Sequence, residues 1–383
     1  MTGPQPLDVD RLVDESRIIV CCGSGGVGKT TTAAALALRA AERGRATVVL
    51  TIDPARRLAQ SLGLVELDNT PRRVAGVDES AGGSLDAMML DMKRTFDEIV
   101  LSHAEPERAA QILDNPFYKA LSSSFSGTQE YMAMEKLGQL AADGRWDVIV
   151  VDTPPSRSAL DFLDAPQRMS TFLDGRMIRL LMAPAKAGGR AYLRVLSAGM
   201  GMFTGILNKI VGQSLLSDLS LFVSGLESMF GGFRERAEKT YQLLKRRGTS
   251  FVVVAVPERD ALREAAYFVE RLGDEGMPLT GLVLNRVHAS GGERLSRQRS
   301  LGAAELLDRL GGHPVAAAVL RLHAERLAVA DRDQRLRDRF SSAHPHVAVA
   351  SVPAFAGDVH DLDGLRSVSA ALAAGSRPGA TAG

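Results

Sequence analysis

Seven short apolar runs recur along the chain, separated by longer stretches in which apolar residues follow helical spacing. Within each run Val, Ile and Leu are nearly continuous and do not alternate with polar residues, which is typical of strands buried on both faces. Such strands in alternation with helices predict an α/β fold with a doubly wound, mostly parallel sheet. The runs cover residues 17–22, 46–53, 85–92, 147–152, 251–256, 279–285 and 347–353.

Two stretches without strand signals break this alternation. Residues 93–146 hold charged helical patterns and a Ser/Gly-rich loop, and residues 160–245 hold six of the thirteen methionines. We expect both to form one helical subdomain inserted into the sheet domain, and the small, polar C-terminal residues predict a disordered tail. The expected boundaries are an N-terminal extension at 1–16, the sheet domain at 17–92, 145–160 and 246–368, the helical subdomain at 93–144 and 161–245, and the tail at 369–383.

Charge and cysteine content exclude several classes of protein. The 46 basic and 45 acidic residues nearly cancel, so no basic surface for nucleic acid is expected. Cys21 and Cys22 are the only cysteines, which excludes a disulfide framework and a CxxC metal site and favours a reducing cytoplasm. The N-terminus is polar and acidic, unlike a signal peptide, and no apolar run is long enough to cross a membrane. A cytoplasmic protein without a transmembrane segment is expected.

Residues 23–30, GSGGVGKT, match the phosphate-loop motif G-x-x-x-x-G-K-[ST] and lie between a predicted strand and an alanine-rich helix. The glycines allow backbone N–H groups to converge on phosphate oxygens at the positive end of the helix. Lys29 is expected to reach the transferred phosphoryl group as a catalytic cation, and the Thr30 hydroxyl to hold Mg²⁺. The motif predicts a P-loop NTPase whose nucleotide-binding residues are Gly25, Gly26, Val27, Gly28, Lys29, Thr30 and Thr31.

Two carboxylates follow predicted strands and complete a nucleotide site. Asp152 ends the run DVIVVD, where a carboxylate can bind Mg²⁺ through water, although it could instead cap the next helix. Asp53 ends the run ATVVLTID and could orient or deprotonate the attacking water. A helix cap for PARRLAQSLG explains Asp53 equally well from the residues alone.

Together these segments resemble the ArsA family of ATPases, with a deviant phosphate loop, which includes the guided-entry ATPase for tail-anchored membrane proteins. The resemblance runs from about residue 18 to residue 366 and implies ATP and Mg²⁺ as cofactors in a cytoplasmic ATPase. The matching segments, in the order of the family, are GSGGVGKTTTAAALAL, TIDPARRL, GTQEYMAME, DTPPSRSALDFL, LVLNRV and VPAFAGDVHDLDGL.

The resemblance also implies roles for individual residues. It makes Asp53 the switch aspartate that activates water, and Asp152 the switch aspartate near the metal, followed by the moving segment 154–156. Asn285 matches an asparagine that hydrogen-bonds adenine, and Pro353 and Phe355 match a segment that closes over the base. From the residues alone, Asn285 could be an ordinary cap at a strand end.

The second position of the phosphate loop departs from the family. Its members, and their ParA and MinD relatives, usually carry a lysine there that crosses a dimer interface to the other subunit's nucleotide, whereas this chain has Ser24. A serine supplies no positive charge to the transition state, and such a loss can cost several orders of magnitude in rate. We therefore expect a homodimer or a heterodimer, and favour a paralogous partner that carries the lysine.

The cysteines mark a second departure. The zinc-binding CxxC that joins dimers of the guided-entry ATPase is absent, so any dimer is held otherwise. Arsenite capture needs separated thiolates, whereas consecutive residues of a strand point to opposite faces, so Cys21 and Cys22 cannot chelate one ion together. An arsenite-pump ATPase is not expected.

Residues 195–232 form an apolar, methionine- and glycine-rich stretch in which Leu219, Phe222, Val223, Leu226 and Phe230 share one helical face. This face could line a groove for a hydrophobic client, or be the core of the insertion or a dimer interface. The expected function is a Mg²⁺-ATP-driven dimer switch that controls a hydrophobic client or membrane-protein partner. The alternative is a weakly hydrolysing regulatory subunit; a ParA- or MinD-like ATPase fits less well, because no basic stripe or terminal amphipathic helix is present.

Overall fold

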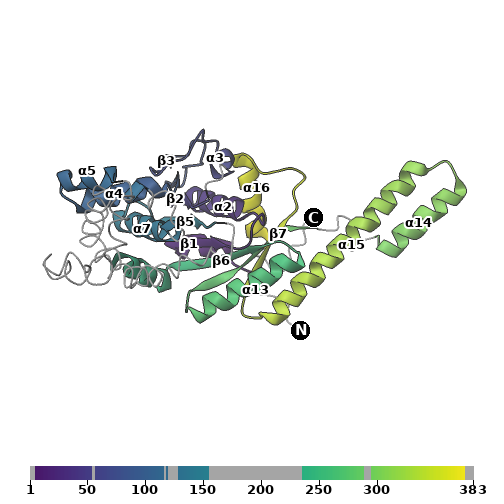
Figure 1. The fold of residues 1–383 in the computed structure, drawn as a ribbon. Helices are drawn as coiled ribbons and strands as arrows, with labels where there is room; N and C mark the ends of the chain where they lie inside the picture. Colours follow the sequence, from purple (N-terminus) through teal and green to yellow (C-terminus); the bar gives the residue numbers. More distant parts are fainter. Residues whose placement is uncertain are drawn as a thin grey trace, which may run out of the picture. The chain divides into compact units, whose positions relative to one another are not determined.

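A single eight-stranded sheet organises the part of the chain that the computed structural model describes, residues 5–53, 57–115, 118–119, 128–154, 235–288 and 295–375 (Figure 1). The strand order is β3-β4-β2-β5-β1-β6-β7-β8, and all pairings are parallel except that of β3 with β4. The prediction of a mostly parallel α/β sheet is confirmed. The strands are β1 Ile18–Cys22, β2 Ala46–Thr51, β3 Arg72–Arg73, β4 Ser84–Met89, β5 Val148–Asp152, β6 Thr249–Ala255, β7 Leu279–Val287 and β8 Ala348–Pro353.

The central strands are buried along their whole length, as their apolar runs predict. Every residue of β1 and β5 is buried, and β1 pairs on one side with β5 and on the other with β6. Because all three strands are parallel, their carboxyl ends meet at one edge of the sheet. The loops that follow them therefore share that edge.

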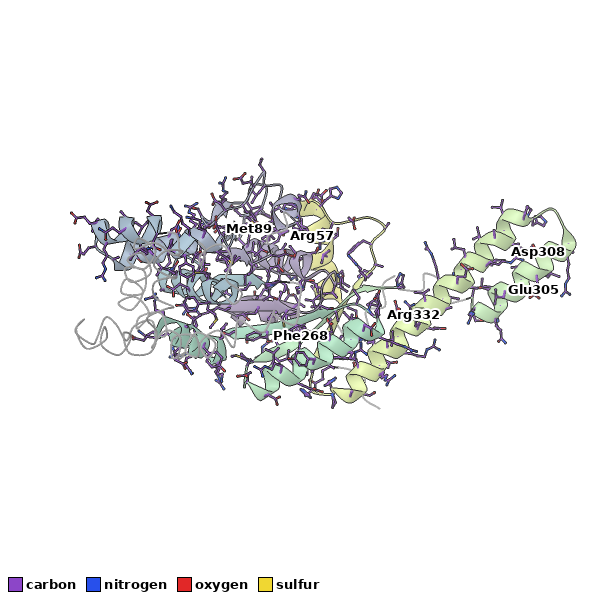
Figure 2. The ribbon with its side chains drawn as sticks, in the orientation of Figure 1. Arg57, Met89, Phe268, Glu305, Asp308 and Arg332 are labelled. Carbon is purple, nitrogen blue, oxygen red and sulfur yellow. The ribbon has the colours of Figure 1, made fainter. Side chains whose placement is uncertain are left out.

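Helices cover both faces of the sheet, which makes it doubly wound (Figure 1). On one face α2 packs on β2 and β5, and α16 packs on α2 and β8. On the other face α13 packs on β6 and β7, and Phe268 of this helix, labelled in Figure 2, is fully buried. The helices around the sheet are α1 Val9–Glu15, α2 Lys29–Glu42, α3 Arg57–Ser61, α13 Arg259–Asp274, α14 Arg297–Leu310, α15 Pro314–Ala343 and α16 Leu362–Ala374.

Both ends of the described chain belong to the core, which corrects two sequence-based boundaries. In the segment expected to be an N-terminal extension, Leu7, Val9, Leu12 and Val13 are buried in the main core cluster. Residue 369 is not the start of a tail, because α16 continues to Ala374 with Leu372 fully buried. Leu365, Val368 and Leu372 have the spacing of one helical face, and this buried face continues past the predicted boundary.

α14 and α15 form a helical hairpin that extends from the sheet (Figure 1). The buried residues of α14 are Ser300 and Ala304, and those in the first half of α15 are Ala317 and Ala324. Small side chains let the two helices approach closely.

The chain divides into two compact units, Met1–Met89 with Gly144–Ala159 and Leu244–Gly383, and Leu90–Asp143 with Leu160–Leu243. The second unit contains α4 Met92–His103, α5 Pro106–Asp114 and α7 Thr128–Asp143. Inside it, Arg236 bonds the buried Glu135 carboxylate at 2.9 Å, and the Tyr118 hydroxyl donates to Asp97 at 2.6 Å. The predicted apolar face at 195–232 lies outside the described residues.

None of the helices that the structure describes combines the length and the apolar character needed to cross a membrane.

Candidate functional site

The phosphate loop, residues 23–30, is shaped by three glycines with positive φ angles: Gly23, Gly26 and Gly28. A Cβ on Gly23 would lie 2.2 Å from the Val254 carbonyl oxygen, and one on Gly28 would lie 2.2 Å from the Asn285 amide nitrogen. Only glycine fits at these two positions, both because of the backbone angle and because neighbouring strands pack closely on the loop. The loop is therefore held against the carboxyl ends of β6 and β7.

Lys29, the first residue of α2, is buried beneath the loop. Its Nζ donates a hydrogen bond to the Ser24 carbonyl oxygen at 2.8 Å. Burial lowers the pKa of Lys29, and the Asp152 and Asp53 carboxylates oppose that shift. When an anionic ligand binds in the loop, the Lys29 ammonium can exchange its hydrogen bond to the Ser24 carbonyl for one to a ligand oxygen.

Asp152, the last residue of β5, is fully buried and links three elements. Its Oδ2 accepts hydrogen bonds from the Thr30 hydroxyl at 2.8 Å and from the Thr51 hydroxyl at 2.9 Å. Its Oδ1 is buried without a hydrogen-bond partner. Burial raises the pKa of Asp152 to about 6, while the two hydroxyl groups favour the ionised form.

A buried carboxylate oxygen without a partner, next to a threonine hydroxyl, fits a hard cation such as Mg²⁺. In the described residues no group of three or more His, Cys, Asp or Glu side chains could hold a metal by itself. Mg²⁺ usually keeps several waters and binds one or two protein groups plus substrate phosphates. Thr30 and Asp152 are the residues that could hold it.

Asp53 lies two residues beyond the end of β2 and is half-buried. Its backbone N–H donates to the Thr51 hydroxyl at 3.2 Å. Its charge raises the pKa of both Lys29 and Asp152, so the three charged groups lie within electrostatic reach of one another. The structure thus brings together Lys29, Thr30, Asp53 and Asp152, all of which the sequence identifies as candidates.

Asn285 lies near the end of β7 and contacts the phosphate loop directly. Its amide Nδ2 donates to the Val27 carbonyl oxygen at 2.9 Å, and its Oδ1 accepts from the Arg286 backbone N–H. The amide thus lies beside the loop, and its observed partner is protein backbone. That role stays a prediction.

Arg286 is a site residue that the sequence reasoning missed. Among the described non-glycine residues it alone has a positive φ, 57°, and its guanidinium donates to the Gly26 carbonyl oxygen at 3.2 Å. Thr51, which shares the Asp152 oxygen with Thr30, was missed as well. A basic residue directly after Asn285 was the available signal for Arg286, whereas nothing in the sequence distinguishes Thr51 from other strand threonines.

Pro353 and Phe355 lie at the same edge of the sheet. β8 pairs with β7, with Pro353 opposite Val287, and the Ala354 N–H donates to the Val287 carbonyl. Phe355 is 41% exposed, which is unusual for a phenylalanine and leaves its ring available for contact. Whether these residues contact a base stays a prediction.

The segment after Asp152 is anchored at its start. The Thr153 hydroxyl donates to the Cys21 carbonyl at 2.8 Å, Pro154 is half-buried, and Pro155 and Ser156 lie outside the described residues. Cys21 and Cys22 are buried, and burial raises both pKa values, that of Cys22 to about 12. These thiols are neutral at ordinary pH and so are poor metal ligands.

The sequence is similar to one described protein family and to several known proteins. The sequence profile of a family described as "Anion-transporting ATPase" matches residues 16–300. "Protein Rv2184c" of Mycobacterium tuberculosis is 33% identical over 172 residues, which span 42% of this chain but only 40% of that protein. "ATPase GET3" of Malassezia globosa is 23% identical over 74% of this chain and 77% of that protein, and "ATPase ARSA2" of Chlamydomonas reinhardtii is 28% identical over 80% and 78%.

Proposed function

The chain belongs to the anion-transporting ATPase family, and we propose that it binds Mg²⁺-ATP at the phosphate loop and hydrolyses the γ-phosphate. The family match confirms the resemblance to ArsA-like ATPases that the sequence indicates, while the deviant class of its phosphate loop stays a prediction. The observation that carries the proposal is the buried Asp152 carboxylate, which bonds Thr30 and Thr51 through one oxygen and leaves the other without a partner. The proposed sheet and helical domains keep the boundaries expected above, apart from the two corrections at the ends.

The chain's own groups are assigned as follows. Backbone N–H groups of residues 25–31 and the N-terminus of α2 bind the phosphates. The Lys29 ammonium leaves the Ser24 carbonyl for the β- and γ-phosphate oxygens and stabilises charge that develops there. The Asp53 carboxylate orients the attacking water and accepts its proton. Mg²⁺, when bound beside Thr30 and Asp152, neutralises part of the phosphate charge.

At the base, Asn285 bonds the adenine edge, and Pro353 and Phe355 cover the ring. This assignment is supported by the position of Asn285 against the phosphate loop and by the exposure of Phe355.

Hydrolysis is proposed to act as a switch. The chain continues from Asp152 at the end of β5 into Pro154, Pro155 and Ser156, and from there into the helical unit. We propose that loss of the γ-phosphate shifts this segment, and with it the start of the helical unit. The proposed output is opening and closing of a dimer that controls a hydrophobic client or a membrane-protein partner in the cytoplasm.

Ser24 supports a second candidate, a nucleotide-binding subunit that hydrolyses ATP only weakly by itself. The position where the family resemblance implies a lysine holds a half-buried serine, which provides no charge. In this case the dimer pairs the chain with a paralogue that carries the lysine.

Steady-state phosphate release from Mg²⁺-ATP distinguishes the two candidates. We expect turnover above background that Asp53→Asn and Lys29→Ala each lower by about 10²-fold or more. Asp274→Asn is the matched control for the aspartate variant, because this carboxylate is exposed at the end of α13. ATP binding with negligible turnover supports the weakly hydrolysing subunit instead. Absence of both binding and turnover refutes the proposed function.

A further inference from the structure

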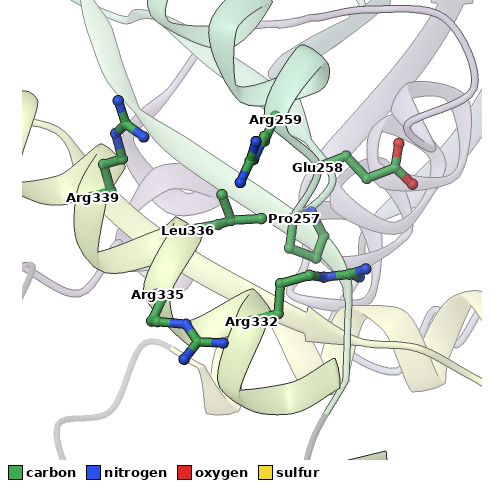
Figure 3. Close-up of a pocket in the computed structure, with 7 residues that line it drawn as sticks. All are labelled: Pro257, Glu258, Arg259, Arg332, Arg335, Leu336 and Arg339. Atoms are coloured by element: carbon green, nitrogen blue, oxygen red, sulfur yellow. The ribbon is translucent and has the colours of Figure 1, made fainter. Parts of the chain in front are cut away.

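A cavity of about 660 Å³ lies between the start of α13 and the second half of α15, and arginines dominate its lining (Figure 3). Arg259 comes from α13, while Arg332, Arg335 and Arg339 come from α15. The spacing of the last three places them on one side of the helix, around Leu336. Figure 3 shows Arg259 extending from the opposite element toward Leu336.

The cavity contains more positive charge than its surroundings neutralise. Arg332 is paired with the fully buried Asp333 at 3.1 Å. Arg259, Arg335 and Arg339 are exposed and form no hydrogen bond or ion pair with any residue that the structure describes. Glu258 is the one carboxylate in the lining, and its carboxylate points away from Leu336 (Figure 3). Three guanidinium groups without counter-charges therefore surround the cavity.

Asp333 fixes the helix that carries three of these arginines. It accepts hydrogen bonds from the backbone N–H of His288 at 3.1 Å and lies 2.8 Å from His288 Nδ1. This joins α15 to the end of β7 at the level of the cavity. The arginines are therefore held by a braced helix, which lowers the entropy cost of gathering them around a ligand.

We propose that this cavity is a second anion site, separate from the phosphate loop, and that it binds a small molecule with phosphate groups. Guanidinium groups donate paired hydrogen bonds that match phosphate geometry, and several of them together neutralise a multiply charged group. The volume lies within the range of small-molecule sites, roughly 300–1,000 Å³. A phosphate group carries more negative charge and more acceptor oxygens than a single carboxylate, so it matches several guanidinium groups better.

The position of the cavity places the second anion near the first. β6, whose end leads through Pro257 into α13, neighbours β1, whose end leads into the phosphate loop. The start of α13 and the phosphate loop thus both follow the carboxyl ends of neighbouring strands, but no residue of the phosphate loop lines the cavity. The proposal does not depend on ATP hydrolysis.

The test measures binding of inorganic pyrophosphate by calorimetry, in a Lys29→Ala background so that the phosphate loop contributes little. The double variant Arg335→Gln/Arg339→Gln is compared with Arg309→Gln/Arg326→Gln, which removes the same charge from exposed arginines of the α14–α15 hairpin that do not line the cavity. We expect the cavity variant to weaken binding at least about tenfold and the control less than about twofold. Equal melting temperatures show that both variants fold.

Three results would overturn the proposal. If pyrophosphate does not bind the Lys29→Ala protein, the cavity does not bind the proposed class of ligand. Equal weakening in both double variants assigns the effect to overall charge. Binding to vesicles of phosphatidylcholine with phosphatidic acid that needs Arg335 and Arg339, without pyrophosphate binding, assigns the arginines to a membrane surface instead of a small molecule. A failed ATPase assay leaves this test unaffected, because it contains no hydrolysis step.

Discussion

At the residue scale, Arg286 is the position where backbone conformation departs most clearly from its residue type. Left-handed φ angles disfavour side chains with a Cβ, and strained residues persist where the surrounding structure holds them. Here the hydrogen bonds from Arg286 to Gly26 and from Asn285 to Val27 hold two successive carbonyls of the phosphate loop. Arg286 is therefore a positioning residue for the loop.

Arg286→Gly distinguishes the effect of losing the guanidinium hydrogen bond from the effect of backbone strain, because glycine adopts the left-handed conformation without strain. We expect the KM for ATP to rise about three- to tenfold, the loss of one charged hydrogen bond, with a melting temperature near that of wild type. Arg286→Ala should show the same KM and a lower melting temperature, and Arg286→Lys should keep most of the affinity. An unchanged KM in the glycine variant would contradict a positioning role.

The cysteines give a pH-dependent prediction. Burial on β1 raises the pKa of Cys22 to about 12 and that of Cys21 well above its usual range, so the reactive thiolate is scarce below pH 9. Iodoacetamide at pH 8 should label neither residue in the folded protein and both in urea, as measured by mass spectrometry. Rapid labelling of the native protein at pH 8 would show that β1 is exposed.

At the element scale, the seven apolar runs predicted every parallel strand that the structure describes, because strands buried on both faces have nearly continuous apolar sequences. The two-residue strand β3 was missed, since Arg72 and Arg73 carry no apolar signal. The helix α1 was missed for a different reason. Its buried residues Val9, Leu12 and Val13 lie on one face of a seven-residue helix, among acidic neighbours. So short an apolar pattern is weak evidence for a helix when the surface that it packs against is unknown.

Leu12→Ala tests whether α1 is part of the core. Leu12 is 4% exposed, and truncation of a buried leucine costs about 2–5 kcal/mol of unfolding free energy. Arg11→Ala is the matched control, because it removes only an exposed pair with Glu15, which contributes about 0–1 kcal/mol. Urea unfolding followed by circular dichroism measures both. Equal stabilities would mean that residues 1–16 form an extension, as the sequence predicts, whose packing does not stabilise the fold.

At the scale of the whole molecule, the sequence supplied the parts of the site but not their contacts. Thr30 and Asp152 are 122 residues apart and Val27 and Asn285 are 258 apart, yet each pair is joined by a hydrogen bond. The motifs predicted that Asp152 and Asp53, at strand ends, would complete a nucleotide site with the phosphate loop. The contacts of Thr51 and Arg286 depend on strand register and on one backbone angle, and neither leaves a sequence pattern.

The residue at position 24 bears on whether a homodimer of this chain can hydrolyse ATP without a lysine from a different partner. The loop contributes the Ser24 carbonyl to Lys29, but the side chain at this position provides no cation. If the trans lysine is what the chain lacks, Ser24→Lys should raise kcat at least about tenfold over Ser24→Ala, because a fixed charge stabilises the phosphoryl transition state. The gain should grow with protein concentration, since the lysine acts across a dimer. A Ser24→Lys protein no faster than Ser24→Ala, beside a wild type that already turns over efficiently, would show that a homodimer needs no donated lysine.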